Sequence, residues 1–509
     1  MSKTYYLTTP LYYVNDVPHI GHAYTTVAAD VLARYKRLMG FDVHFLTGTD
    51  EHGQKIWRAA EAKKTETQKF VDQMADGFKS AWQVLGISYD DFIRTTDERH
   101  VKVVQQVFHQ LLKQGDIYKG SYEGWYCVPC ESFWNESELK EDIDGRMLCP
   151  DCGRETEVLK EESYFFKLSK YEKQLLEHFE SNPDFLQPQS RRNEILQFVK
   201  QGLKDLSITR TAFPWGIGVP DDPKHVIYVW FDALLNYISA LGYPAGKEFT
   251  QFWPADAHLM GKEIVRFHAV TWPCMLMALG IHLPKKIFGH GWWTVEGKKM
   301  SKSKGNVVDP LALSREYSVD VVRYFLMREV SFGDDGNFSM TSFVNRYNAD
   351  LANDFGNLLS RTLSMVDKYF EGIIPEIIDF KLLGFDQISK DLLAAVRVME
   401  DEFDARMQEF SFSEALAEIW KVVNLANAYI EKEAPWKLSK EKQTDKLAAV
   451  MYLLCETLKR AAVLVSPFMP STAEKMWEQL NLSLPFSIDR KIMGVKVAKG
   501  QPLFPRVQK

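Results

Sequence analysis

Few cysteines and the lack of a long apolar run set the first limits on this chain of 509 residues. It contains six cysteines, which is too few for a fold built on disulfides. It has no run of ~18 or more apolar residues, and its start, MSKTYYLTTP, lacks the apolar core of a signal peptide. We therefore predict a cytoplasmic protein with no membrane partner.

The sequence also lacks a strong excess of either charge. Its formal net charge is −6 at pH 7, with 26% of the residues charged. Proteins that coat nucleic acid without sequence preference need a large basic excess to neutralise phosphates. We therefore expect no DNA partner, although a local basic surface is compatible with this charge.

The length and pattern indicate several domains. At ~100–200 residues per domain the chain holds about three, and its 46% hydrophobic content is typical of globular proteins. Residues 4–13 predict a strand, 22–39 a helix that stops before Gly40, and FDVHFLTGTDEHG (41–53) a second strand. This βαβ order predicts a parallel sheet with ligands at the carboxyl ends of its strands.

The rest of the chain completes a doubly wound, Rossmann-type α/β domain and adds an all-α bundle. Strands are expected at 225–231 and 285–293, with a helix over 261–280 between them, and the pattern beyond about 340 is helical. The predicted domains are a first half of the sheet domain (1–115), an insertion (116–225), a second half (226–340) and a helical bundle (341–509).

The stretch VNDVPHIGHA (14–23) places two histidines at the start of the first predicted helix. Free N–H groups and the positive end of the helix dipole favour an anion there, and Gly21 lets a ligand approach the backbone. The alternative is a plain turn between strand and helix that happens to contain histidine.

A second stretch, EGKKMSKSKGN (296–306), crowds four lysines between glycines. A flexible cationic loop suits the neutralisation of a polyphosphate leaving group. A solvated basic turn is the alternative.

Four of the six cysteines form a C-x2-C-x18-C-x2-C pattern: Cys127, Cys130, Cys149 and Cys152. Two such knuckles close one tetrahedral Zn(II) site, and an all-cysteine site leaves no position open for catalysis. Two disulfides are the alternative, which a cytoplasmic chain disfavours. The spacing predicts one structural zinc.

Taken together, the two stretches resemble the signatures of class I aminoacyl-tRNA synthetases. They read His19-Ile20-Gly21-His22 and Lys299-Met300-Ser301-Lys302-Ser303. The resemblance implies that His19, His22 and Lys302 stabilise ATP, with Lys299 in support, while an amino-acid carboxylate attacks the α-phosphorus. It implies ATP binding, with Mg(II), by residues 19–22 and 299–303 and by His290 and Gly291.

Longer blocks are similar to the methionyl-tRNA synthetases over essentially the whole chain, among them VIYVWFDALLNYISALGY and HGWWTVEGKKMSKSKGN. The resemblance implies that L-methionine is activated to an adenylate and transferred to tRNA(Met), both initiator and elongator. Asp50 would pair with the substrate ammonium. An apolar and aromatic pocket, suited to a thioether, would be lined by Leu11, Tyr13, Trp230, Ala233, Tyr237, Ile264, His268 and Trp272.

When two amino-acid side chains differ by one methylene, an apolar pocket binds them with free energies that differ by only about 1–3 kcal/mol. We therefore expect homocysteine to be activated too, and then removed by cyclisation in the same site.

The resemblance also implies roles for the insertion, the second half-domain and the bundle. The insertion would be of the single-knuckle type, in which the four cysteines together hold one zinc. Residues 226–340 would include a region that contacts the tRNA stem. Anticodon reading would involve Pro435 and Trp436, whose indole could stack on an unpaired base, with Asn353, Asn357 and Arg361 as polar partners. A buried core tryptophan is the alternative for Trp436.

Other functions compete with this interpretation. A class I synthetase for another aliphatic amino acid would carry a larger editing insertion than the ~110 residues predicted here. A zinc-ribbon nucleic-acid binder would not need both signatures, and a small nucleotidyltransferase would not need the cysteines or the bundle. The chain stops after the bundle, so we expect a monomer, with room for a separate tRNA-binding partner chain.

Overall fold

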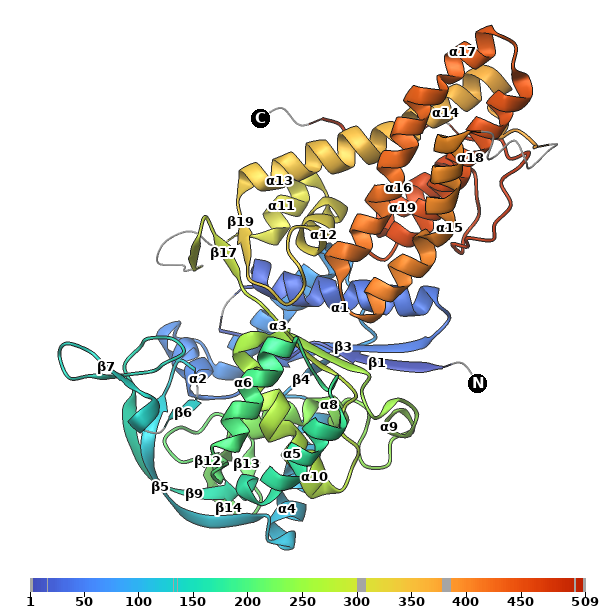
Figure 1. The fold of residues 1–509 in the computed structure, drawn as a ribbon. Coiled ribbons are helices and arrows are strands. Elements are labelled where there is room, and N and C mark those ends of the chain that lie inside the picture. The colour runs from blue at the N-terminus through green and yellow to red at the C-terminus, as the bar shows by residue number, and fades with distance from the viewer. Residues whose placement is uncertain are drawn as a thin grey trace. The chain divides into compact units, whose positions relative to one another are not determined.

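The computed structural model describes residues 3–15, 17–130, 132–134, 136–299, 308–377, 386–498 and 500–506. Contacts divide the chain into two compact units (Figure 1). The first comprises the residues up to Ala29 together with Met39–Trp292, and the second comprises Asp30–Leu38 and the residues from Trp293 onward. Helix α1 (Ile20–Leu38) therefore gives its first turns to one unit and its last turns to the other.

Seven strands of the described chain form the main sheet of the first unit, and all of them pair in parallel. They are β1 (Thr4–Thr8), β2 (Tyr12–Tyr13), β3 (Asp42–Asp50), β4 (Asp91–Arg94), β10 (Leu186–Gln187), β15 (Ala257–Gly261) and β16 (Ile287–His290). Their order is β10-β16-β15-β1-β3-β2, with β4 also paired to β3. The order reverses at β1, where a doubly wound sheet binds its ligand. The predicted α/β fold is confirmed.

Burial on both faces explains why β1 and β3 are almost continuously shielded from water. The last four residues of β1 and the last eight of β3 are buried, as is usual in parallel sheets covered by helices. Position 48 in β3 also requires glycine, because a Cβ there would lie 1.9 Å from the carbonyl oxygen of Ile93 in β4. Only glycine allows these two strands to lie side by side.

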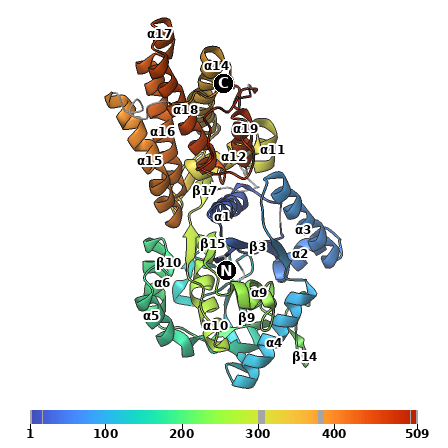
Figure 2. The ribbon, with the colours of Figure 1, turned by 90° about the vertical axis from the view of Figure 1, so that its right-hand side faces the viewer.

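Helices cover this sheet and share its hydrophobic core. Figure 2 shows α2 and α3 beside the β3 side of the sheet and α5 and α6 beside the β10 side. The helices of the unit are α2 (Gln54–Ala62), α3 (Thr67–Val84), α4 (Glu98–Gln114), α5 (Glu172–Ser181), α6 (Gln189–Lys200), α7 (Val229–Leu234), α8 (Asn236–Ser239), α9 (Lys247–Phe252), the π-helix η4 (Phe267–Thr271) and α10 (Trp272–Leu279).

Antiparallel strands occupy much of the stretch predicted as an insertion. The longest pair is β5 (Ile117–Cys127) with β9 (Glu157–Phe166), extended by β6 (Ser132–Trp134) and β11 (Leu206–Ser207). A short hairpin, β7 (Lys140–Glu141) with β8 (Met147–Leu148), lies between the two cysteine knuckles. Strand β10 comes from the same stretch but belongs to the main sheet, and the predicted domain limits themselves stay predictions.

The prediction that residues 225–231 form a strand of the main sheet is wrong. Strand β14 (Asp222–Ile227) pairs antiparallel with β12 (Thr209–Arg210) and β13 (Gly218–Val219), and helix α7 follows it. The main sheet instead takes β15 from residues just before the predicted helix. A short apolar run does not distinguish a strand from a buried helix by its periodicity, and here tertiary burial selects the helix.

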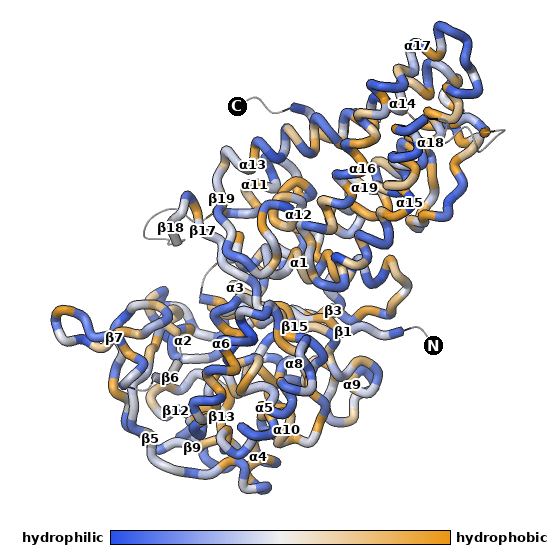
Figure 3. The backbone as a smooth tube through the Cα atoms, in the orientation of Figure 1, coloured by the Kyte–Doolittle hydropathy of each residue, from blue (hydrophilic) through white to orange (hydrophobic). Residues whose placement is uncertain are grey.

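The second unit is mainly helical, as predicted. Hydrophobic and hydrophilic segments alternate along its helices (Figure 3), which is the pattern of amphipathic packing. The helices are α11 (Pro310–Tyr317), α12 (Val319–Arg328), α13 (Met340–Arg346), the π-helix η6 (Tyr347–Gly356), α14 (Asn357–Phe370), α15 (Gln387–Gln408), α16 (Phe412–Glu433), α17 (Pro435–Lys440), α18 (Thr444–Val465) and α19 (Pro470–Gln479), beside a small sheet of β17 (Trp293–Val295), β18 (Lys298–Lys299) and β19 (Gly336–Phe338).

A buried ion pair fastens the last turns of α1 within this unit. Nη2 of Arg323 lies 2.6 Å from Oδ2 of Asp30, and neither side chain is exposed. The guanidinium also donates to the carbonyl oxygens of Pro467 and Phe468, at 2.9 Å each. A buried charge needs such a complete set of partners, because an unpaired one is strongly destabilising.

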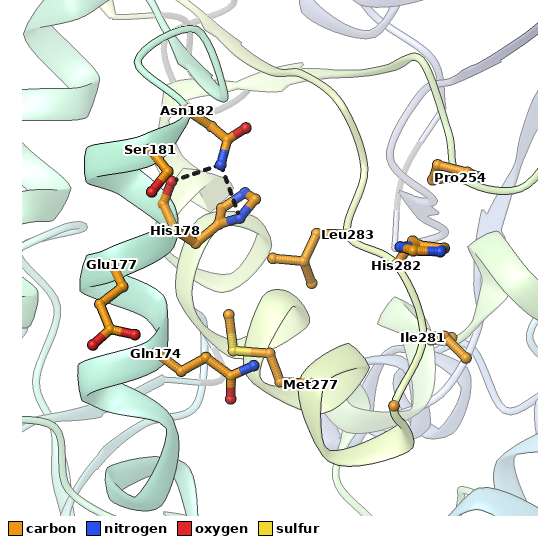
Figure 4. Close-up of a pocket in the computed structure, with 11 residues that line it drawn as sticks. Gln174, Glu177, His178, Ser181, Asn182, Pro254, Met277, Ile281, His282 and Leu283 are labelled. Atoms are coloured by element: carbon orange, nitrogen blue, oxygen red, sulfur yellow. Dashed lines mark hydrogen bonds between the residues drawn. The ribbon is translucent and has the colours of Figure 1, made fainter.

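A groove of about 820 Å³ opens between α5 and the end of α10 (Figure 4). Its walls are formed by Gln174, Glu177, His178, Ser181, Asn182, Pro254, Met277, Gly280, Ile281, His282 and Leu283. None of the residues predicted to be functional lines it. Among the described residues, no helix is both long and apolar enough to cross a membrane.

Candidate active site

The two predicted histidines meet at the start of α1. The helix begins at Ile20, so His22 lies in its first turn, where unpaired N–H groups and the helix dipole favour an anion. The rings of His19 and His22 stack with their centroids 3.8 Å apart. A Cβ on Gly21 would come within 3.0 Å of Cε1 of His19, so glycine leaves room for that ring to fold back over the helix start.

Backbone N–H groups fix the protonation of both rings. The N–H of Gly21 donates to Nδ1 of His19 (3.1 Å), and the N–H of His19 donates to Nδ1 of His22 (3.3 Å). A ring nitrogen that accepts a hydrogen bond carries no proton, so Nε2 carries it in each neutral ring. Burial, followed by the charge of His19, lowers the pKa of His22 well below its ordinary value. His22 is therefore a neutral N–H donor at neutral pH.

His290, the last residue of β16, lies against the same helix. Its Nδ1 donates to the carbonyl oxygen of Gly291 (2.8 Å), and its Nε2 accepts from the hydroxyl of Thr25 (2.6 Å). Burial lowers the pKa of His290, although Gly291 and the charge of Glu263 act in the opposite direction. The structure thus brings the predicted residues His290 and Gly291 to the helix that carries His19 and His22.

The lysine stretch falls largely outside the described residues. Lys299 ends β18, which pairs with β17 through Thr294, but nothing further is described of its side chain. Met300, Ser301, Lys302 and Ser303 lie outside the described residues. Their predicted role in binding ATP stays a prediction.

Asp50 ends β3, and a dense set of hydrogen bonds holds the turn that follows it. Asp50 is 7% exposed and lies opposite Tyr13 in the pairing of β2 with β3. The next residue, Glu51, is fully buried, and its carboxylate accepts two hydrogen bonds from Arg94 at 2.7 and 2.9 Å. The negatively charged carboxylate of Asp50, at the end of the strand that leads into this turn, is suited to pair with an ammonium group.

Ring contacts join four of the residues predicted for methionine, namely Trp230, Tyr237, His268 and Trp272. The ring of Trp230 lies 6.0 Å from that of His268, and the ring of Tyr237 lies 5.8 Å from those of His268 and Trp272. Ala233 is buried on α7 between Trp230 and Tyr237. Leu11 and Ile264 are partly buried against the same hydrophobic cluster. The sequence therefore predicted a true cluster of aromatic and apolar side chains.

Neutral histidines complete this cluster. Tyr237 donates its hydroxyl to Nε2 of His268 (2.7 Å), whose Nδ1 donates to the carbonyl oxygen of Ile264 (2.9 Å). Burial lowers the pKa of His268 to about 4. It also lowers the pKa of His258, which accepts from the indole of Trp272 at 3.4 Å. Both histidines of the cluster are thus neutral at neutral pH.

Sequence reasoning missed several members of this arrangement. His258 contacts the ring of Tyr237 at 4.2 Å, and Phe267 stacks on Trp230 at 3.9 Å with the planes 6° apart. Asp232, completely buried, accepts from His52 and His100. Asp232 lies within the block VIYVWFDALLNYISALGY, but nothing in that block by itself assigns a role to it. The one available signal for Asp232 was an acidic residue within an apolar run of the sequence.

The four predicted cysteines form a compact group. Their sulfur atoms lie within 4.8 Å of one another, with 3.6 Å between Cys127 and Cys152 and 4.0 Å between Cys130 and Cys149. Four thiolates around one zinc at ~2.3 Å would lie ~3.8 Å apart, which fits this group. All six cysteines of the chain are described and none of them forms a disulfide, so the alternative of two disulfides is wrong. The group can hold a metal ion.

The predicted anticodon residues lie on helices of the second unit. Trp436, in the first turn of α17 directly after Pro435, is 43% exposed, which contradicts the alternative of a core tryptophan. Asn353 in η6 and Asn357 in α14 are exposed. Arg361 pairs with Glu431 near the end of α16 at 2.6 Å, and α16 leads directly into α17.

The chain is similar to known proteins over its whole length. Residues 5–158 and 147–363 match the family described as tRNA synthetases class I (M), and residues 389–494 match the anticodon-binding domain of tRNA ligase. A methionine--tRNA ligase of Caldanaerobacter subterraneus subsp. tengcongensis is 54% identical over 100% of this chain and 79% of its own length. The enzyme of the same name from Clostridium tetani is 53% identical over 99% and 79%.

Solved structures agree with these relatives. Mycobacterium tuberculosis methionyl-tRNA synthetase in complex with methionyl-adenylate matches with a TM-score of 0.95 at 43% identity. The match covers 99% of this chain and 100% of that one.

The low pKa of His268 predicts how stability depends on pH. Unfolded histidine titrates near ~6.5 but folded His268 near 4, so below pH 6.5 the unfolded state binds a proton that the folded state does not. The free energy of unfolding should fall by about 2–3 kcal/mol between pH 6.5 and pH 4.5 on account of this residue. Urea unfolding at both pH values should show this fall reduced in His268→Gln. An identical pH dependence in both proteins would contradict the assignment.

Proposed function

We propose that this chain, which belongs to the methionine--tRNA ligase family of class I tRNA synthetases, charges tRNA(Met) with methionine in two steps. The carboxylate of L-methionine attacks the α-phosphorus of ATP, which forms methionyl-adenylate and releases pyrophosphate. A hydroxyl at the 3′ end of the tRNA then attacks the carbonyl carbon of the adenylate, and AMP leaves. Full-length relationship to ligases of this name supports the activity.

The observation that carries the amino-acid specificity is the joint placement of Asp50 and the aromatic cluster in one unit. In our proposal the carboxylate of Asp50 pairs with the substrate ammonium. The thioether lies among Leu11, Tyr13, Trp230, Ala233, Tyr237, Ile264, His268 and Trp272, because aromatic edges favour sulfur. Neutral His268, with its pKa of about 4, adds no charge that would attract a charged side chain.

The proposed activation step relies on positioning and charge stabilisation rather than on a covalent enzyme intermediate. His19 and His22 would donate from Nε2 to phosphate oxygens, with Ile20, Gly21, His290 and Gly291 completing the nucleotide site. Lys299 and Lys302, with Met300, Ser301 and Ser303, would neutralise the departing pyrophosphate. Mg(II) bound with ATP would supply further positive charge for this neutralisation.

We further assign zinc to the four-cysteine group and anticodon binding to the end of the helical unit. Cys127, Cys130, Cys149 and Cys152 would hold one structural Zn(II). Hydrogen bonding from Cys130 lowers the pKa of Cys127 to about 6, so a thiolate ligand is readily formed. Trp436 and Pro435, with Asn353, Asn357 and Arg361, would read the anticodon of initiator and elongator tRNA(Met).

The proposed working state is a cytoplasmic monomer with no DNA or membrane partner, and a separate tRNA-binding chain is compatible with it. The lack of disulfide bonds among the six cysteines, all of which are described, suits a reducing compartment. The alternative activity is that of a class I synthetase for another aliphatic amino acid.

ATP–pyrophosphate exchange with each of the twenty amino acids tests the function. Methionine should support exchange at least about tenfold better than any other of the twenty amino acids. A pocket of fitting shape discriminates ~10–200-fold between substrates that differ by one methylene. Homocysteine, assayed in addition, should be activated and released as thiolactone. Preferred exchange with leucine, isoleucine or valine would establish the alternative.

Metal analysis tests the zinc site. Protein purified in zinc-replete medium should contain one zinc per chain by atomic emission, and Cys149→Ala should lose it because three thiolates bind far more weakly than four. Cys274→Ala, which removes a buried thiol outside the group, should keep its zinc. A metal content near zero in the unaltered chain would refute the assignment.

Aminoacylation kinetics test the anticodon contact. Trp436→Ala should lower kcat/KM for tRNA(Met) by roughly 5–150-fold, since stacking on one base contributes ~1–3 kcal/mol. Trp436→Phe should recover part of the loss. Exchange activity without tRNA should not change, and Val398→Ala, which trims another exposed side chain of the same unit, should behave like the unaltered chain. Unchanged kcat/KM in Trp436→Ala would remove this residue from the anticodon site.

A further inference from the structure

Asp232 is a fully buried acid on α7 that accepts hydrogen bonds from two histidines. Its Oδ2 lies 2.7 Å from Nδ1 of His52, and its Oδ1 lies 2.7 Å from Nε2 of His100. Asp232 and His100 are 0% exposed and His52 is 5% exposed. These three residues come from α7, the turn after β3 and α4, so the carboxylate joins three separate elements.

The bond to His52 reaches the turn that carries Asp50. His52 follows Asp50 by two residues, and its backbone carbonyl accepts from the hydroxyl of Tyr13 at 3.0 Å. Its ring also packs edge-on against Trp215, with the centroids 5.7 Å apart. His52 is therefore held through its backbone on the β2 side and through its ring by α7.

The other end of this link is the helix that carries part of the aromatic cluster. Asp232 stands between Trp230 and Ala233 in the six-residue helix α7. A shift of Asp232 relative to His52 would therefore also shift Trp230 and Ala233 relative to Asp50. The distance between these two groups limits the length of an amino acid that can bind to both.

We propose that Asp232, through its hydrogen bond with His52, is a positioning residue that fixes the spacing between Asp50 and α7 and thereby selects amino acids of the length of methionine. The inference rests on the proposed function, because it assumes that Asp50 and Trp230 bind opposite ends of the substrate.

The charge of Asp232 is part of this arrangement. Burial alone would raise the pKa of its carboxyl, but the charges and hydrogen bonds of His52 and His100 outweigh burial and lower it. The ionised carboxylate accepts from both rings at once. An asparagine has one acceptor oxygen and would turn its NH2 group toward one of the two ring N–H groups.

Three substitutions separate positioning from a purely structural role. His52→Ala removes the link between the turn and α7, whereas His52→Asn keeps an N–H donor near the place of Nδ1. His100→Ala is the control, because it removes an equally short, buried hydrogen bond to the same carboxylate from α4, together with the bond of His100 to Ser239, without touching the turn after Asp50.

ATP–pyrophosphate exchange is measured for these three variants and for a fourth, Asp232→Asn, with methionine and with ethionine, which is one methylene longer. His52→Ala should raise KM for methionine about tenfold or more and lower the preference for methionine over ethionine, while KM for ATP changes less than about twofold. His52→Asn should restore most of both values. His100→Ala should lower the midpoint of urea unfolding but keep KM for methionine and the preference. Asp232→Asn should behave like His52→Ala.

Equal changes in KM and preference in His52→Ala and His100→Ala would overturn the inference, as would unchanged values in His52→Ala. The two His52 variants decide the question even where Asp232→Asn does not fold. Failure of the unaltered chain to activate methionine would instead overturn the proposed function, and the inference with it.

Discussion

The parallel pairing of β1, β3, β15 and β16 is the constraint on which the rest of the candidate site depends. Parallel strands end at the same edge of a sheet, so Asp50 and His290, far apart in the sequence, are carried to one side of the first unit. The reversal of strand order at β1 opens that edge for a ligand. Gly48 contributes by allowing β4 to lie against β3, which secures the strand that ends in Asp50.

Hydrogen bonds to the histidines determine what this edge can do. Backbone N–H groups occupy Nδ1 of His19 and of His22, so the proton of each neutral ring is on Nε2. His268 stays neutral because burial lowers its pKa to about 4, although its bond to the carbonyl oxygen of Ile264 acts in the opposite direction. The site therefore combines neutral donors with fixed carboxylates, an arrangement in which a cationic loop would supply most of the positive charge.

Much of the fold and of the candidate site could be predicted because it rests on local signals. The βαβ unit showed in the periodicity of residues 4–53, and the cysteine knuckles showed in their spacing. The prediction of a main-sheet strand at 225–231 was wrong, because an apolar run of that length is compatible with a strand as well as with a buried helix. His258, Phe267 and Asp232 could not be found, since each acquires its role only from neighbours distant in sequence.

The sequence alone determined the fold class, the two signatures, the four-cysteine pattern and the relationship to one family, because each depends on residue type and spacing along the chain. Only the tertiary structure decided that His22 is neutral, that Trp436 is exposed and that Asp232 links the turn after Asp50 to α7. Protonation, exposure and such links depend on burial and on partners that folding brings together. Neither the burial nor the partners can be read from the order of residues.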